Sequence, residues 1–168
     1  MSWSSVTLVL GGARSGKSAH AESLFAAGGT YIATAAIGDE EMAARIAKHR
    51  ARRGAIWTTV EAPLDLAPAL DAHPGAVLVD CLTLWLSNLM FANRDLDRAA
   101  LDLEQALSRH PGPVALVANE VGLGIVPDNA LARAFRDQAG LLNQRLAAKA
   151  GRVVFIAAGL ALVFKETA

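Results

Sequence analysis

The chain has 168 residues, in which 16 lysines and arginines balance 16 aspartates and glutamates. A neutral chain has no overall field that attracts nucleic acid or a membrane surface, so we expect no nucleic-acid partner and only a local basic site. Its apolar runs are about five to seven residues long, well short of the roughly 20 that a membrane-spanning helix needs.

Cysteine content and length constrain the protein further. Cys81 is the single cysteine, which excludes an internal disulfide framework. A chain of this length buries a core without disulfides or structural metal, so we expect one domain over residues 1–168. With no cationic and apolar signal at Met1–Ser5, the expected compartment is the reducing cytoplasm.

Along the chain, short apolar runs alternate with segments of helical periodicity. The runs lack polar alternate positions, as do strands covered on both faces. They are residues 6–10, 30–34, 76–80, 114–119 and 153–158. Amphipathic spacing predicts helices at 18–27, 40–53, 64–73, 96–110 and 130–150, the last with Leu131, Phe135, Leu142 and Leu146 on one stripe. This alternation predicts an α/β fold with a central, mostly parallel sheet.

The first strand and the first helix enclose a glycine-rich turn. Gly11 is followed after four residues by Gly16, Lys17 and Ser18, the spacing of a phosphate-binding P-loop between a strand and a helix. In such a loop backbone N–H groups converge on phosphate oxygens, the lysine neutralises phosphate charge and the serine binds Mg²⁺. The alternative is a glycine-rich turn with an incidental lysine.

Asp80 ends the apolar strand at 76–80. An aspartate there fits the Walker B position, where a carboxylate helps to hold Mg²⁺. The alternative is an aspartate that caps a helix beginning near Leu82.

The predicted second helix changes from acidic to basic. Between positions 45 and 53 lie Arg45, Lys48, His49, Arg50, Arg52 and Arg53. In a helix His49 shares one face with Arg45 and Arg53. Neighbouring cations disfavour the protonated imidazole, so His49 keeps a lone pair at neutral pH and suits a nucleophile that attacks phosphorus. The alternative is a solvated basic face.

Two other groups of residues are less specific. His20, His73 and His110 fit surface or packing positions, and no pair among the four histidines has zinc-site spacing with a third ligand. Asn119 and Glu120 follow the strand at 114–119, where open α/β sheets bind their ligands, ahead of a predicted helix cap at Asp128. A plain strand-to-helix loop is the alternative for this stretch.

Taken together, these motifs resemble the bifunctional adenosylcobinamide kinase/adenosylcobinamide-phosphate guanylyltransferases of cobalamin biosynthesis. The resemblance covers nearly the whole chain. It rests on "GGARSGKS" (11–18), "YIATA" (31–35), "DEEMAARIAKHRARRG" (39–54), "WTTVEAPLDL" (57–66), "NEVGLGIVP" (119–127) and "ARAFRDQAGLLNQRLAAKA" (132–150).

The resemblance implies two successive reactions. A hydroxyl on the aminopropanol arm of adenosylcobinamide takes the γ-phosphoryl group of ATP or GTP. Adenosylcobinamide phosphate then receives GMP from GTP through a guanylyl-histidine, which gives adenosylcobinamide-GDP and pyrophosphate. The histidine of the matching motif is His49, so the resemblance implies that His49 and Lys17 are catalytic.

The resemblance also implies binding residues and an assembly. The nucleotide contacts that it implies are Gly11, Gly12, Ala13, Arg14, Ser15, Gly16, Lys17, Ser18, Ala33, Thr34, Ala35, Arg50, Ala51, Arg52, Arg53, Glu61 and Asp80. Ser18 and Asp80 are the expected Mg²⁺ ligands. The expected architecture is a P-loop NTPase (RecA-like) three-layer fold, assembled as a homotrimer.

Two other classes of function remain open at this point. The first is a P-loop kinase for another small alcohol, in which His49 has no covalent role. The second is a nucleotide-binding switch or assembly module without catalysis. Only the bifunctional enzyme predicts a covalent link between the chain and GMP.

Overall fold

The computed structural model describes residues 3–35 and 55–167. Its elements are β1 (Trp3–Gly11), α1 (Lys17–Ser23), β2 (Gly29–Ala33), β3 (Trp57–Glu61), α3 (Leu66–Ala72), β4 (Val77–Asp80), α4 (Leu82–Phe91), α5 (Leu96–Arg109), β5 (Val114–Asn119), α6 (Ala130–Lys149), β6 (Ala150–Ala157) and β7 (Leu160–Glu166).

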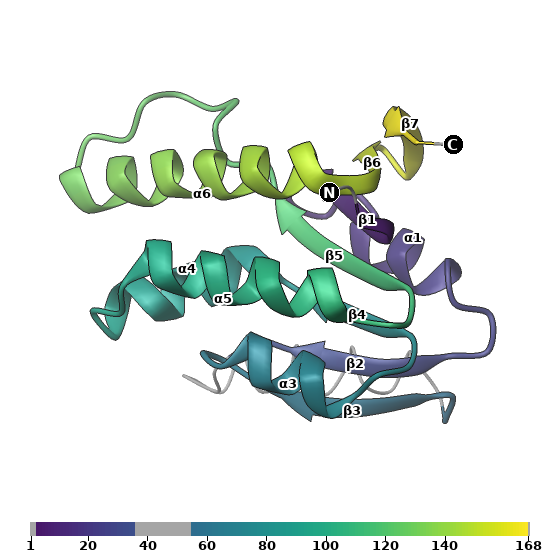
Figure 1. Cartoon of the computed structure of the whole chain (residues 1–168). Coiled ribbons are helices and arrows are strands. Elements are labelled where there is room, and N and C mark those ends of the chain that lie inside the picture. The colour runs from purple at the N-terminus through teal and green to yellow at the C-terminus, as the bar shows by residue number, and fades with distance from the viewer. Residues whose placement is uncertain (1–2, 36–54, 168) are drawn as a thin grey trace.

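A single seven-stranded sheet forms the centre of the molecule (Figure 1). The strand order is β3-β2-β4-β5-β1-β6-β7, and every neighbouring pair is parallel except β6 and β7. Gly11 is in register with Asn119, and Ala33 is in register with both Glu61 and Asp80. The carboxyl ends of these parallel strands meet at one edge of the sheet. The candidate residues at the strand ends therefore share one edge of the sheet.

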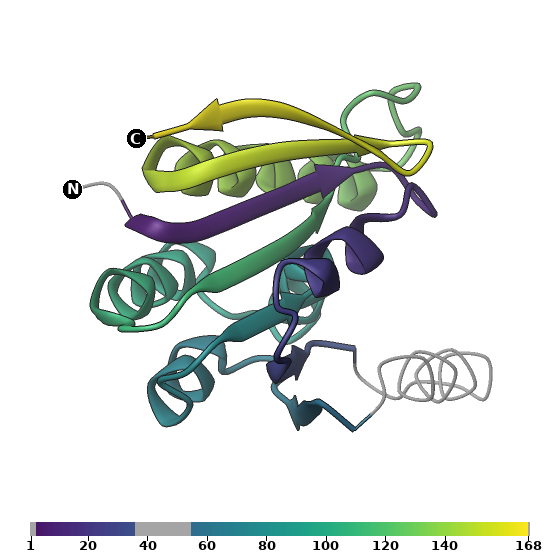
Figure 2. The same ribbon diagram turned by 90° about the vertical axis from the view of Figure 1, so that its right-hand side faces the viewer.

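Helices cover both faces of this sheet, which makes three layers (Figures 1 and 2). Helix α1 packs Ala21, with Phe25 just beyond its end, against one face. Helices α3 to α6 pack the larger core cluster against the other face, with Leu103 and Leu146 fully buried. The predicted P-loop NTPase fold with a mostly parallel sheet is confirmed.

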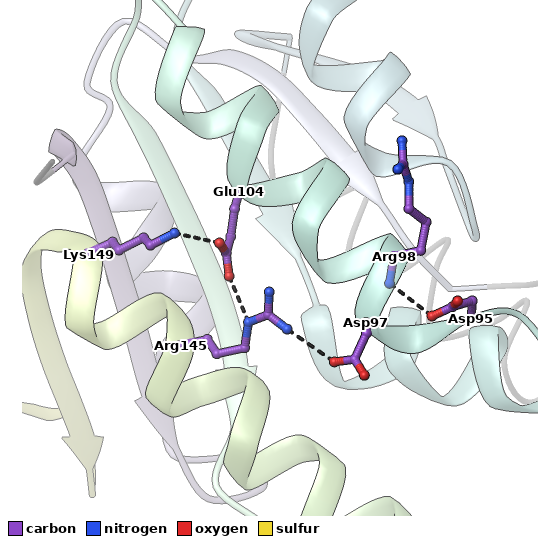
Figure 3. Close-up of polar contacts among 6 residues, drawn as sticks. All are labelled: Asp95, Asp97, Arg98, Glu104, Arg145 and Lys149. Carbon is purple, nitrogen blue, oxygen red and sulfur yellow. Dashed lines mark hydrogen bonds and ion pairs between the residues drawn. The ribbon is translucent and has the colours of Figure 1, made fainter.

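An ion-pair network joins two of the helices on the larger face (Figure 3). Glu104 of α5 is only 6% exposed, and its two oxygens accept hydrogen bonds from Arg145 Nε (2.7 Å) and Lys149 Nζ (2.5 Å) of α6. Arg145 also reaches Asp97 at the start of α5. A buried carboxylate needs such partners because desolvation penalises its charge.

The structure differs from the sequence-based predictions in several places. β3 and β7 were not expected as strands, and α1 ends at Ser23 rather than near residue 27. The predicted apolar stripe of α6 is only partly right, because Leu131 is 55% exposed while Leu142 and Leu146 are buried. Within the described ranges, none of the helices combines the length and apolar character that crossing a membrane requires.

Candidate functional site

The turn after β1 has the backbone of a phosphate-binding loop. Gly11, Arg14 and Gly16 have positive φ angles of 153°, 54° and 102°. A Cβ on Gly11 would lie 2.4 Å from the carbonyl oxygen of Ile156 on the neighbouring strand, so only glycine fits there. Residues 11–18, called the phosphate cradle below, thus curl tightly between β1 and α1.

Lys17, the first residue of α1, lies against this curl. Its side chain is buried, with 7% exposure, and Nζ donates a hydrogen bond to the carbonyl oxygen of Gly12 at 2.5 Å. Burial lowers the pKa of Lys17 below its ordinary value, while the nearby charge of Asp80 raises it again in part. The structure therefore brings the P-loop lysine and the strand-end aspartate into one electrostatic environment.

Two features of the cradle fit a bound phosphate. Ser15 Oγ is buried and has no hydrogen-bond partner among the described residues, an orphaned polar group of the kind that ligands satisfy. On the outer side, Gly159 in the β6–β7 turn donates its N–H to the carbonyl oxygen of Ser15 at 2.9 Å. The hairpin of β6 and β7 thus supports the cradle through this hydrogen bond.

Asp80 at the end of β4 is held by a buried tyrosine. Tyr31 Oη donates a hydrogen bond to Asp80 Oδ2 at 2.6 Å, which fixes one carboxylate oxygen. Helix α4 is capped by Cys81, whose Sγ accepts from Leu84 N. The alternative in which Asp80 caps this helix is therefore wrong.

The oxygen groups at this edge suit magnesium. Ser18 lies in the first turn of α1 and is partly buried, and Asp80 supplies a carboxylate. Mg²⁺ prefers such hard oxygen ligands and binds through one or two protein groups plus phosphates and water. Among the described residues there is no group of three histidines, cysteines, aspartates or glutamates that could hold a metal ion.

The predicted contacts on the outer strands lie at the same edge. Thr34 follows β2, and its hydroxyl donates to the carbonyl oxygen of Cys81 (2.7 Å) and accepts from Cys81 N (2.8 Å). Asn88 of α4 donates to the carbonyl oxygen of Thr34. Ala33 and Ala35 are partly buried beside it, and Glu61 at the end of β3 is exposed. Nucleotide contacts at these positions stay a prediction.

The proposed nucleophile and its basic neighbours lie outside the described residues. His49, Arg50, Ala51, Arg52 and Arg53 belong to the range 36–54. Their assigned roles therefore rest on the sequence.

The other three histidines lie in different surroundings. His73 and His110 pair through ring nitrogens with the carbonyl oxygens of Ala69 (2.8 Å) and Gly75 (2.9 Å). His20 lies on α1, and burial, with the positive charge of Arg152, lowers its pKa. The prediction of surface or packing roles fits His73 and His110. For His20 it stays a prediction, because His20 Nε2 is buried and has no hydrogen-bond partner among the described residues.

The end of β5 borders the cradle directly. Asn119 N donates to Thr83 Oγ1 at 2.7 Å, and Glu120 N donates to the carbonyl oxygen of Gly11 at 3.0 Å. The cap of α6 is Asn129, whose Oδ1 accepts from Ala132 N. The predicted cap at Asp128 is wrong by one residue.

A separate hollow lies among α4, α5 and α6. Its volume is about 270 Å³, and its lining includes the apolar side chains of Trp85, Leu89 and Leu142 and the polar side chains of Gln138 and Arg145. No predicted site residue lines it. The hollow is therefore separate from the predicted site at the carboxyl edge of the sheet.

Sequence reasoning missed four residues that organise the site. Tyr31 bonds to Asp80, and Thr83 bonds to Asn119 at the end of β5. Asn88 bonds to Thr34 after β2, and Gly159 bonds to Ser15 in the cradle. Each acts across at least 36 residues of sequence, so no local pattern identifies it. The one available signal is that Tyr31 is the single tyrosine of the chain and lies in an apolar strand.

Solved structures support the fold alone. Flagellar accessory protein FlaH from Methanocaldococcus jannaschii matches with a TM-score of 0.53 at 11% identity, over 98% of this chain and 79% of that one. A second solved structure, of an ATPase domain, matches with a TM-score of 0.50 at 10% identity, over 92% of this chain and 70% of that one.

Sequence relatives are much closer. The family model described as cobinamide kinase / cobinamide phosphate guanyltransferase matches residues 7–164. The bifunctional adenosylcobalamin biosynthesis protein CobP of Pseudomonas aeruginosa is 50% identical, over 94% of this chain and 96% of that protein. The corresponding CobU of Salmonella typhimurium is 46% identical, over 94% and 98%. With this match and the P-loop geometry at the sheet edge, the chain belongs to the cobinamide kinase / cobinamide phosphate guanyltransferase family.

Proposed function

We propose that the chain performs both reactions of its family with one phosphate cradle, residues 11–18. The observation that carries this proposal is the position of Lys17, buried against Gly12 and within electrostatic reach of Asp80. A triphosphate on the cradle would meet converging backbone N–H groups and the lysine charge. The kinase and the guanylyl transfer both begin from a bound nucleoside triphosphate, so one cradle serves each in turn.

In the kinase step, the cradle holds the γ-phosphoryl group of ATP or GTP in line with the acceptor hydroxyl of adenosylcobinamide. Phosphoryl transfer depends on positioning and charge stabilisation rather than on covalent chemistry by the protein. Lys17 stabilises the charge that develops on the phosphate oxygens. The product is adenosylcobinamide phosphate, the substrate of the second reaction.

Ser18 and Asp80 are the proposed ligands of Mg²⁺, with Tyr31 orienting the aspartate. When bound, the ion neutralises charge on the β- and γ-phosphate oxygens. Asp80 ends β4, and β5 lies between β4 and β1, the strand that leads into the cradle. From this position the carboxylate would support the ion from one side.

In the second step, His49 attacks the α-phosphorus of GTP. A bond forms between the imidazole nitrogen and phosphorus, and the bond to the leaving pyrophosphate breaks. The phosphate of adenosylcobinamide phosphate then displaces histidine and takes the GMP group. Arg50, Ala51, Arg52 and Arg53 after the histidine, and Ala33, Thr34, Ala35 and Glu61 at the outer strand ends, are proposed as further nucleotide contacts.

The remaining aspects of the proposal concern assembly and location. We infer a homotrimer of single-domain chains that acts in the cytoplasm without a nucleic-acid partner. The buried, unpaired thiol of Cys81 fits a reducing compartment, and the balanced charge of the chain fits small-molecule substrates. Light scattering on the purified protein measures the mass of the assembly and would contradict a trimer if it gave a monomer.

Labelling with GTP tests the central proposal. The protein is mixed with Mg²⁺ and GTP labelled at the α-phosphate, and the chain is isolated and treated with acid. We expect label that acid removes, as a phosphorus–nitrogen bond to histidine requires. A chain that stays unlabelled but still phosphorylates adenosylcobinamide would be a kinase without guanylyltransferase activity. A chain that binds GTP but catalyses neither reaction would be a binding module.

A further inference from the structure

Glu120 lies directly beside the phosphate cradle and has no role in the functions described so far. It follows Asn119, the last residue of β5, and its N–H donates to the carbonyl oxygen of Gly11 at 3.0 Å. β5 is the strand between β4, which ends at Asp80, and β1, which leads into the cradle. Glu120 is thus anchored between the lysine side and the metal side of the proposed site.

The carboxylate of Glu120 is oriented but only half engaged. Its Oε1 accepts a hydrogen bond from Gly122 N at 2.6 Å, whereas Oε2 has no bonded partner in residues 3–35 and 55–167. A Cβ on Gly122 would lie 2.9 Å from Oε1, so the glycine lets the loop close around the carboxylate. One oxygen is therefore fixed and the other is left to a substrate.

Glu120 is half-buried, and the loop on its outer side is exposed to solvent. The loop that follows carries Leu123 and Ile125 with exposures of 82% and 97%. A bulky acceptor can therefore approach the carboxylate from this side, while the triphosphate lies on the cradle.

Other described carboxylates at this edge are less well placed. Asp80 accepts a hydrogen bond from Tyr31 and faces the proposed metal position. Glu61 ends β3, which is separated from β1 by β2, β4 and β5. Among the strand-end carboxylates in the described part of the chain, Glu120 is the one joined to the P-loop backbone.

The two reactions differ in whether they need a base. Phosphorylation of an alcohol releases the proton of the hydroxyl group, and kinases provide a carboxylate that accepts it. Guanylyl transfer to adenosylcobinamide phosphate uses a phosphate oxygen that is already ionised, so this step needs no such base.

We propose that Glu120 is the general base of the kinase reaction, an inference that rests on the cradle proposed above. Its carboxylate takes the proton of the acceptor hydroxyl as the oxygen forms a bond to the γ-phosphorus. The bond from the γ-phosphorus to the bridging oxygen breaks, and that electron pair leaves with the nucleoside diphosphate. The proton on Glu120 then passes to solvent through the open side of the loop.

Glu120→Gln tests this role without removing the loop contact, because the amide oxygen of glutamine still accepts from Gly122 N. Kinase turnover is measured with γ-labelled ATP and adenosylcobinamide, and guanylyl transfer with GTP and adenosylcobinamide phosphate. We expect kinase kcat to fall about a hundredfold or more, with KM for ATP and guanylyl transfer within about threefold of wild type. Asp128→Asn, an exposed carboxylate in the same loop, is the matched control and keeps both activities.

Two results would overturn the inference. Wild-type kinase turnover in Glu120→Gln would make Glu120 a residue that only shapes the loop. A loss of both reactions together would make it part of the fold or of nucleotide binding. Absence of kinase turnover in the wild-type protein is a different result, because it contradicts the proposed function itself.

Discussion

Two clusters of charged side chains in this molecule are built in opposite ways. In the Glu104 cluster, formed by Glu104, Arg145 and Lys149, both carboxylate oxygens are bonded to cations across the α5–α6 contact (Figure 3). At the phosphate cradle, Lys17 bonds only to the carbonyl oxygen of Gly12 and makes no ion pair within the described residues. One cluster is complete without a ligand, and the other is not.

The difference separates stability from function. The fully paired Glu104 offsets its own burial, since a buried charge without partners is strongly destabilising. Lys17 and the orphaned Ser15 Oγ are buried without equivalent compensation, a cost that a bound phosphate would repay. Substitutions at the cradle should therefore change activity, and substitutions in the Glu104 cluster should change stability.

The largest effect is expected for His49→Ala. It removes the proposed nucleophile, and neighbouring arginines cannot replace it because they have no lone pair at neutral pH. Guanylyl transfer should disappear, and kinase turnover should persist at a reduced level because it needs no covalent step. Acid-labile label from α-labelled GTP, measured beside kinase turnover, checks both.

His49→Gln is the matched control for size and polarity, and it should behave like His49→Ala. Label retained on either variant at the wild-type rate would place the nucleophile elsewhere in the chain.

Lys17→Ala should weaken both reactions. Removal of one charge-stabilising donor lowers turnover by about a hundredfold or more, and one cradle is proposed for both triphosphates. The melting temperature should not fall, because Lys17 has no ion pair to lose among the described residues and its charge is buried. A collapse of kinase turnover with normal guanylyl transfer would contradict the shared cradle.

Substitutions of Asp80 and of Tyr31, which bonds to it, should have a smaller effect on turnover. Asp80→Asn removes the charge proposed to support Mg²⁺, so the Mg²⁺ concentration for half-maximal turnover should rise about tenfold or more, while metal-free nucleotide binding changes less. Tyr31→Phe removes only the orienting hydrogen bond and should cause a smaller shift in the same direction. An Mg²⁺ titration unaffected by Asp80→Asn would exclude the metal role.

The cradle and the sheet edge could be predicted because their signals are local. Gly11, Gly16 and Lys17 have fixed spacing in the sequence, and Asp80 and Asn119 end apolar runs. Parallel strands then bring these ends to one edge whatever their order. The order itself, with β5 between β4 and β1, depends on crossovers that no local pattern encodes.

The errors have physical causes as well. β3 and β7 lie at the two edges of the sheet. In β3 polar residues such as the exposed Thr58 interrupt the apolar run, whereas β7 is apolar in sequence and its side chains, such as Phe164, are nevertheless exposed. Helix α6 has 20 residues and is therefore about 30 Å long, so its first turn, with Leu131, passes beyond the core. Contacts such as Tyr31–Asp80 join residues 49 apart and arise only from the tertiary fold.

Glu104→Ala should lower stability, because it breaks the Glu104 cluster. It removes hydrogen bonds to two charged groups that are themselves partly exposed, so we expect a loss of about 1–2 kcal/mol in the free energy of unfolding. Asp102→Ala, which breaks an exposed pair with Arg98 on the same helix, should cost less than about 0.5 kcal/mol. Urea unfolding measures the stability of both variants, and the kinase turnover of both should be unchanged. A loss of turnover in folded Glu104→Ala would contradict the separation of stability from function.

The smallest effect is the pH dependence of that stability. Burial alone would raise the pKa of Glu104, but the hydrogen bonds from Lys149 and Arg145 outweigh it and hold the pKa below its ordinary value of 4.5. A carboxylate whose pKa is lower in the folded state stabilises the protein fully above its unfolded pKa, and this contribution is lost as the pH falls through the folded value. The difference in unfolding free energy between wild type and Glu104→Gln should therefore be constant from about pH 7 to about pH 5 and shrink below about pH 4.5. Urea unfolding of the two proteins at matched pH isolates Glu104, because the other carboxylates are common to both. A difference that stays constant down to about pH 3 would show that the network does not favour the ionised form of Glu104.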